Sequence, residues 1–327
     1  MSTDVLSDVL RAVRLSGAVY FLVDASAPFA AEALPARDLA PLAMPGAEHL
    51  IEYHLVTRGT CWGGIVGEEP VLLHEGDIIV FPQGDPHVMS SSPGLRGRAP
   101  LEAFRRPPGS QLPFTLREEG GGDRTQLVCG FLGCDLHPFN PLLATLPRTL
   151  RVSTRDGAGW LESLARLAVA ESGASRNGGE CVLARASELM FVEVIRRHLA
   201  SLPPGQTGWL AGLRDPFVGR ALAALHDRPA EPWTVESLSK EAALSRSALA
   251  ERFTHLVGEA PMQYLARWRM QLAATLLRSR NASVFEAAMD VGYASEAAFS
   301  RAFKKAVGVP PAAWREGHRQ AAAKLEP

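Results

Sequence analysis

Short hydrophobic runs alternate with polar and turn-forming residues over the first half of the chain, and this pattern predicts strands. The runs lie at residues 19–23, 49–57, 71–73, 78–81 and 126–131. Glycine and proline residues separate them, as is typical of a β-rich domain. A domain of this kind is therefore expected over about residues 18–150.

Beyond about residue 158 the apolar positions follow a helical period. Two apolar stripes, at 160–168 and 182–195, predict a pair of helices. The pair either forms a dimer interface or packs on the β-rich domain, and the pattern is compatible with both. A linker with prolines and glycines at 201–208 precedes a second region whose pattern is helical to about residue 321.

This C-terminal region contains an internal repeat with an offset of 50 residues. The matched pairs are Ser245/Ser295, Leu249/Phe299, Phe253/Phe303, Gly258/Gly308 and Pro261/Pro311, with Glu236/Glu286 further upstream. Each copy predicts a helix, a turn and a second helix, at about residues 234–257 and 284–307. The serine of each copy is expected to cap the second helix and the glycine to end it.

The repeat also separates buried from exposed positions. The buried stripes are expected to be Val235/Phe285, Leu238/Ala288, Leu249/Phe299 and Phe253/Phe303. The side chains left exposed on the two second helices are expected to face DNA, and they are Arg246, Ser247, Ala250, Glu251, Glu296, Ala297, Ser300, Arg301, Lys304 and Lys305.

These exposed side chains suit different parts of a duplex. Arg301 is suited to a guanine edge, and Glu251 or Glu296 is suited to the amino group of cytosine. Arg246 and the pair of lysines are suited to phosphates. For each of them, a solvated surface side chain is the alternative.

A helix predicted at 262–278 joins the two units. At 1.5 Å per residue it is about 25 Å long. With the flanking helices, this separation places the two second helices roughly one DNA turn, about 34 Å, apart. Double-stranded DNA is therefore the partner that the repeat predicts.

Composition and charge are compatible with this interpretation. The net charge of −1 hides an asymmetry, because residues 240–320 carry 12 Lys/Arg against 7 Asp/Glu and the remainder carries 22 against 28. No apolar run reaches the length of a membrane span, and the first 17 residues lack a signal-peptide core. A cytoplasmic protein with reduced cysteines is expected.

The repeat resembles the DNA-binding domain of the AraC/XylS family of transcriptional regulators over about residues 215–317. The second half of the family pattern is intact at Gly292-Tyr293, Ser295, Phe299, Phe303-Lys304, Gly308 and Pro310-Pro311. The resemblance implies that the base-reading positions are Ser247, Ala250 and Glu251 in the first unit, and Glu296, Ala297, Ser300 and Arg301 in the second.

A second motif lies in the β-rich domain. Residues 76–87 fit G-x5-P-x-G-x2-H, ending at His87, and resemble the second cupin motif in full. The first cupin motif is degraded to Gly46 followed by Glu52 and His54. Because Glu52 and His54 are two residues apart, they share one face of a strand. With His87 they form a two-histidine, one-carboxylate set that suits a divalent metal such as non-haem iron. Barrel histidines with ordinary hydrogen bonds, or an effector pocket without metal, are the alternatives.

The whole chain resembles a subgroup of the AraC/XylS family that carries an N-terminal cupin sensor. The strings FLVDASAPFA, YHLVTRGTCWGG, LVCGFLGCD and NPLLATLP fit that resemblance. It implies an α+β multidomain protein with a cupin-like β-barrel sensing an effector at 1–155, a helical dimerisation or linker region at 156–205, and an all-α DNA-binding domain at 212–320. Some members respond to oxidants through cysteines, for which Cys61, Cys129 and Cys134 are the candidates here; buried, inert thiols are the alternative.

The sequence therefore predicts a transcriptional regulator and not an enzyme. Its cupin domain is expected to sense a small molecule, a metal or an oxidant. The expected partners are promoter DNA, RNA polymerase and a second copy of the chain. The alternative is a cupin metalloenzyme of the dioxygenase or isomerase type, fused to a DNA-binding domain.

Overall fold

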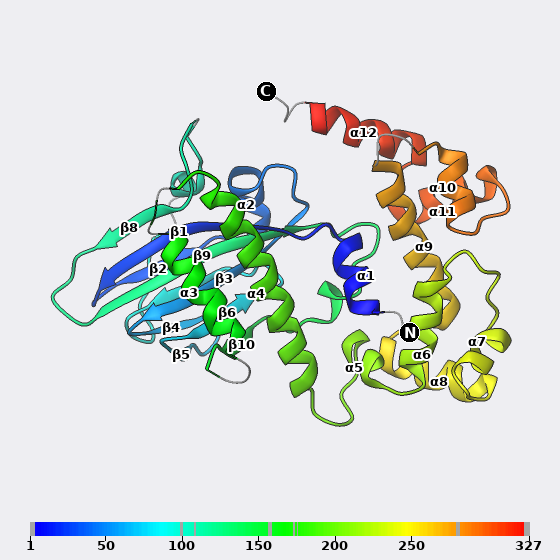
Figure 1. Cartoon of the computed structure of the whole chain (residues 1–327), viewed down its shortest axis with the longest axis horizontal. Helices are drawn as coiled ribbons and strands as arrows, with labels where there is room; N and C mark the ends of the chain where they lie inside the picture. Colours follow the sequence, from blue (N-terminus) through cyan, green and yellow to red (C-terminus); the bar gives the residue numbers. More distant parts are fainter. Residues whose placement is uncertain are drawn as a thin grey trace. The chain divides into compact units, whose positions relative to one another are not determined.

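The chain forms two compact units in the computed structural model, which describes residues 4–98, 101–107, 109–155, 159–172, 174, 176–278 and 282–323. The sheet unit comprises Arg14–Asp135 and Leu146–Ser201. The helical unit comprises Met1–Val13, Leu136–Thr145 and Leu202–Pro327. Figure 1 shows the strands of the first unit and the helices of the second. This is the α+β arrangement that the hydrophobic pattern predicts.

The sheet unit contains two sheets. The six-stranded sheet has the order β10-β6-β3-β9-β1-β8 and the four-stranded sheet has the order β2-β7-β4-β5. The strands are β1 (Ser16–Ser26), β2 (Ala30–Ala33), β3 (His49–Arg58), β4 (Thr60–Ile65), β5 (Val71–His74), β6 (Asp77–Phe81), β7 (His87–Ser90), β8 (Phe114–Glu118), β9 (Arg124–Cys134) and β10 (Leu150–Ser153). Each of the five predicted runs lies in a strand. Apart from the parallel pair β1–β8, the strand pairs are antiparallel.

The glycines of the cupin-like motif fit their positions for steric reasons. Gly84 has φ +65°, and a Cβ there would lie 2.2 Å from the Cβ of Ala36. Gly76 has φ +86°, and a Cβ there would lie 2.7 Å from the Thr154 hydroxyl. Because only glycine adopts such backbone at little cost, the turn before β6 depends on Gly76 and the turn between β6 and β7 depends on Gly84. The latter turn brings His87 back into the barrel.

Helices cover the outside of the sheet unit. They are α2 (Ala36–Ala43), α3 (Trp160–Ser172) and α4 (Gly179–Ser201), with a short 3₁₀ helix, η1 (Leu101–Phe104). The buried face of α4, including Leu183, Met190 and Val194, packs on β1. The Tyr53 hydroxyl from β3 hydrogen-bonds to Ser187 of α4 inside this contact. Helix α4 therefore packs on the sheet and α3 packs on α4, whereas the predicted role of the pair in a dimer interface stays a prediction.

The helical unit contains both copies of the repeat. Its elements are α1 (Val5–Ala12), the 3₁₀ helix η2 (Leu143–Thr145), α5 (Trp209–Arg214), α6 (Val218–Asp227), α7 (Val235–Glu241), α8 (Arg246–Val257), α9 (Pro261–Arg278), α10 (Val284–Asp290), α11 (Glu296–Val307) and α12 (Pro311–Ala323). The pairs Leu249/Phe299 and Phe253/Phe303 are fully buried, as predicted. Pro261 and Pro311 each begin a new helix, where a missing N–H costs nothing.

The two copies differ by one residue in the turn, which corrects the constant offset of 50. Helix α7 begins at Val235 and α10 at Val284, an offset of 49, whereas α8 and α11 are offset by 50. Phe285 is therefore not the counterpart of Val235. It is 56% exposed, and the prediction that it is buried was wrong.

Two segments from the first half of the sequence belong to the helical unit. Residues 4–13 and 136–145 group with its helices, although the sequence predicted a single uninterrupted domain over 1–155. Helix α1 buries Val5, Val9 and Ala12 and packs against α6 and α9. In the part of the chain that the structure describes, no helix is both long and apolar enough to span a bilayer.

Candidate functional site

The second helix of each helix-turn-helix unit is held at both ends by local interactions. Ser245 caps α8 by accepting a hydrogen bond of 3.2 Å from the Ala248 N–H, and Ser295 does the same for α11 with Ala298. Gly258 and Gly308 end the helices in the left-handed conformation. Caps of this kind fix where a helix begins and ends, and so which side chains share its outer face.

The predicted DNA-facing side chains lie on these two helices. Eight of the ten are exposed, and the small residues Ala250 and Ser300 are half-buried. In α11, Arg301, Lys304 and Lys305 concentrate positive charge in the middle and last turns. In α8 the exposed Arg252 is instead paired with Asp215 at 2.6 Å, so its charge is already compensated. The two outer faces therefore differ in charge.

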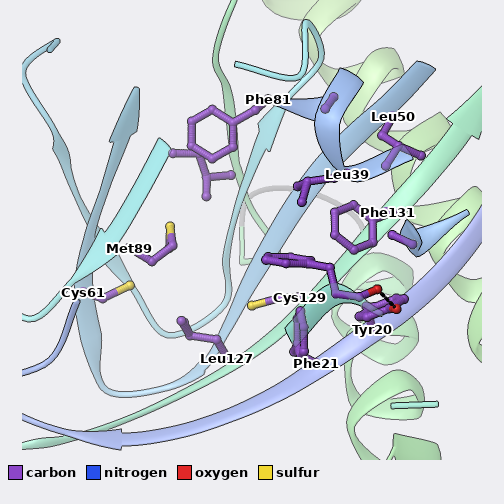
Figure 2. Packing of buried hydrophobic residues seen from close by; sticks show 14 of the residues in the cluster. Tyr20, Phe21, Leu39, Leu50, Cys61, Phe81, Met89, Leu127, Cys129 and Phe131 are labelled. Carbon is purple, nitrogen blue, oxygen red and sulfur yellow. Dashed lines mark hydrogen bonds between the residues drawn. The ribbon is translucent and has the colours of Figure 1, made fainter. Parts of the chain in front are cut away.

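The second site is a largely apolar cavity in the barrel of the sheet unit. Its volume is about 330 Å³. The apolar wall includes Phe21, Phe104, Leu127 and Phe131, and the polar residues Glu52, His54 and His87 line it as well. Figure 2 shows Phe21, Leu127, Cys129 and Phe131 grouped in this part of the core. The sequence identified the three polar residues but not the apolar wall, since strand alternation alone does not distinguish a cavity lining from a filled core.

Strand pairing explains why the three polar residues meet. Glu52 and His54 lie on the same face of β3, and Glu52 pairs with Phe81 of β6 and Phe131 of β9. The ring of His87 stacks on Phe81, with centroids 3.8 Å apart. His87 Nε2 lies 2.7 Å from His54 Nε2 and 4.0 Å from Glu52 Oε2.

The protonation states follow from the hydrogen bonds. His87 Nδ1 lies 2.9 Å from the Asp85 carbonyl oxygen, which only accepts, so Nδ1 carries the proton. Nε2 of His87 therefore accepts from the Nε2–H of His54. The Nδ1 atom of His54 is then an acceptor, and it is buried without a hydrogen-bond partner, as is Glu52 Oε1.

Burial shifts the pKa of each of these groups in the direction that favours its neutral form. Desolvation raises the pKa of Glu52 to about 8, and desolvation lowers the pKa of His87 to about 4. The pKa of His54 is also lowered, first by desolvation and then by His87. Because both partners are neutral near pH 7, the 4.0 Å approach of His87 and Glu52 is not an ion pair.

This arrangement does not fit a metal ion. The Nε2 atoms of His54 and His87 lie 2.7 Å apart and share a hydrogen bond, so no space is left between them for a cation. Within the described ranges, no group of three or more His, Cys, Asp or Glu side chains is placed to hold a metal. No metal-dependent chemistry is therefore derived from this site.

The redox candidates lie inside the sheet unit. Cys61, Cys129 and Cys134 are buried as free thiols, and Cys181 is exposed. Desolvation raises the pKa of Cys61 and Cys134 to about 12 and raises that of Cys129 further. Since the thiolate is the reactive form, this environment disfavours oxidation of these side chains.

Comparison with known proteins agrees with the arrangement of a cupin domain followed by helix-turn-helix units. A cupin family model matches residues 4–200 and a helix-turn-helix domain model matches residues 238–317. An AraC-like transcription regulator of Streptomyces lividans is 36% identical over 275 residues, which is 83% of this chain and 88% of the relative. The HTH-type transcriptional regulator AlkR of Acinetobacter baylyi is 27% identical over 321 residues, 96% of this chain and 99% of the relative.

Among solved structures, the DNA-binding domain of AdpA in complex with a target DNA is 34% identical, with a TM-score of 0.32. The likeness covers 35% of this chain and 99% of that one. A cupin domain followed by paired helix-turn-helix units defines a DNA-binding transcriptional regulator. The chain belongs to the family of AraC-like transcriptional regulators with an N-terminal cupin domain, as the sequence predicted.

Proposed function

We propose that the regulator reads promoter DNA with the outer faces of α8 and α11 and that the cavity in its sheet unit holds the effector that controls this binding. Exposure of the side chains supports the first part, with Arg301 at a guanine edge and Glu251 or Glu296 at a cytosine. Arg246, Lys304 and Lys305 hold phosphates.

The helix between the two units supports a bipartite DNA site. Helix α9 has 18 residues, so it is about 27 Å long. Successive major grooves on one face of a duplex are about 34 Å apart, a distance that α9 and the helices flanking it can span. The first copy has Ala250 and Glu251 where the second copy has Ser300 and Arg301. The two half-sites are therefore expected to have different base sequences.

The observation that carries the effector proposal is the mostly apolar cavity with a buried carboxyl whose Oε1 has no hydrogen-bond partner. A folded protein rarely leaves such an atom unsatisfied, and a bound molecule would complete it. The raised pKa values of the cysteines favour a small molecule over oxidation as the signal.

Helices α3 and α4 supply the proposed contact with a second copy. Their outward faces carry the apolar side chains Trp160, Leu167, Val169, Val182 and Leu189, each at least 38% exposed. A symmetric dimer would cover this surface and would bring two DNA-binding units to one promoter. Promoter-bound protein would then recruit or block RNA polymerase. We propose no catalytic role, since its relatives are transcription regulators.

In vitro selection from a random DNA pool, followed by fluorescence anisotropy, tests the proposal. We expect an asymmetric consensus spanning two grooves and an affinity that falls steeply with salt. Selection that enriches no sequence, at any salt concentration, would reject sequence-specific binding. Purified protein that turns over a substrate would point to the enzyme alternative.

A further inference from the structure

The cavity in the sheet unit has an apolar wall, a buried polar end at Glu52 and exposed charged side chains at its rim. Phe21 and Phe104 form an edge-to-face pair with centroids 5.4 Å apart, and Phe104 lies 6.1 Å from Phe131. Leu127 and Met89 extend this wall. A cavity of about 330 Å³ lies at the small end of the usual range for ligand pockets, roughly 300–1,000 Å³. It suits a compact molecule with an apolar body.

The polar end offers hydrogen-bond acceptors without compensating cations. Glu52 is only 2% exposed, its Oε1 atom has no partner, and desolvation is the sole cause of its raised pKa. The cations that line the cavity, Arg98 and Arg117, are exposed and belong to its rim. The neighbouring imidazoles are neutral. A donor from outside the protein is what this end lacks.

The neighbours of Glu52 also favour a positive group. Phe131 pairs with Glu52 across β3 and β9 and lines the same cavity. The face of an aromatic ring attracts a cation, and this attraction grows when water is excluded. Folding has already removed the Glu52 carboxyl from water, so an ammonium group pairs with it at the cost of its own desolvation and, at neutral pH, of releasing the Glu52 proton.

We infer that the cavity binds a small amphiphilic amine, with its ammonium group at Glu52 beside Phe131 and its apolar body along the phenylalanine wall. A carboxylate ligand would be repelled by Glu52 wherever Glu52 is ionised, and a pure hydrocarbon would leave Oε1 unsatisfied. This inference rests on the proposed effector role of the cavity and adds the chemical class of the effector.

Octylamine, octanol and octanoate are the probes, since they share a chain and differ in the head group. We expect calorimetric titration of the full chain above pH 8, where Glu52 is ionised, to show octylamine binding at least about tenfold more tightly than octanol, with no binding of octanoate, because a charge-assisted hydrogen bond is stronger than a neutral one. Glu52→Gln keeps the shape of the site and should reduce the affinity for octylamine to the affinity for octanol.

Glu118→Gln is the matched control, because Glu118 is a carboxylate in the lining of the same cavity but is exposed. It should leave the preference for octylamine intact. An equal loss of octylamine affinity in both variants would mean that the amine binds through general negative charge, and this would overturn the inference. So would preferential binding of octanoate or octanol, or stoichiometric binding of manganese or zinc ions that excludes octylamine.

DNA affinity is measured separately, by anisotropy on a selected fragment with and without octylamine. A change in affinity that Glu52→Gln abolishes supports both the amine site and the effector role. If octylamine binds at Glu52 but DNA affinity is unchanged, the amine site stands and the proposed effector role fails.

Discussion

The side-chain amide of Gln271 donates a hydrogen bond of 2.9 Å to the carbonyl oxygen of Ala12, at the end of the N-terminal helix α1. Gln271 is fully buried in the middle of α9, the helix that joins the two helix-turn-helix units. Its Oε1 atom accepts a hydrogen bond of 3.0 Å from the Phe139 N–H. One side chain therefore ties two distant segments of the chain to the joining helix.

Replacing Gln271 by leucine should destabilise the helical unit by about 1–3 kcal/mol, because it leaves the buried Phe139 N–H unsatisfied and leaves the Ala12 carbonyl with only the 3.4 Å hydrogen bond from Thr275. Urea unfolding followed by tryptophan fluorescence measures this, since Trp209, Trp233, Trp268 and Trp314 lie in the helical unit. Gln320→Leu, at an exposed amide on α12, is the control. Equal midpoints for the two variants would contradict the role of Gln271.

The helical unit should lose stability in mild acid through His226. The Trp209 indole donates to the Tyr264 hydroxyl, whose oxygen lies 2.8 Å from His226 Nε2, and His226 Nδ1 lies 3.9 Å from Asp8. Desolvation lowers the pKa of His226 from 6.5 to about 3. The unfolded chain therefore binds a proton that the folded chain does not, and the stabilisation present above pH 6.5 falls as pH drops toward 3.

Protonation of His226 in the unfolded chain should lower the free energy of unfolding by about 1.4 kcal/mol per pH unit below 6.5. His226→Gln should flatten the decline of the unfolding midpoint, whereas His255→Gln, at an exposed histidine of α8, should leave it unchanged. If wild type and His226→Gln lose stability in parallel, another group is responsible.

The one-residue difference between the two turns predicts opposite responses to substitution. Gly292 has φ +83°, and a Cβ there would lie 2.4 Å from the Ala230 carbonyl oxygen. Gly292→Ala should therefore cost about 2 kcal/mol or more. Ala243 adopts φ +54° in the first turn, so Ala243→Gly should stabilise that turn by roughly 0.5–1 kcal/mol. Thermal unfolding of both variants measures these two changes in stability. A loss of stability of similar size in each variant would contradict the predicted opposite responses.

Arg301 and Lys305 should contribute differently to DNA binding. Arg301→Ala is expected to weaken binding to the selected site by about 1–3 kcal/mol and to relax the preference at one base pair. Lys305→Ala should weaken binding to all sequences alike and reduce the slope of log affinity against log salt by about one. Anisotropy on matched and mismatched fragments separates the two, and unchanged base preference in Arg301→Ala would remove it from the base-reading positions.

Much of the site was predictable because it depends on local rules. The serines that cap α8 and α11, the glycines that end them, and the turn between β6 and β7 each act within a few residues. The same-strand placement of Glu52 and His54 follows from strand alternation. Phe285 was misplaced because the repeat was aligned with a constant offset, and a turn lengthened by one residue rotates every position of the helix before it.

The sequence by itself determined the class of protein: a β-rich domain, a repeated helix-turn-helix, and the side chains presented by its second helices. Only the tertiary structure decided that Gln271 meets Ala12 and Phe139, that His54 donates to His87, and that an apolar cavity surrounds Glu52. The physical reason is that capping, glycine conformation and periodicity act between near neighbours. Contacts between distant residues depend on how a whole unit packs, and burial then sets the charge of the groups they enclose.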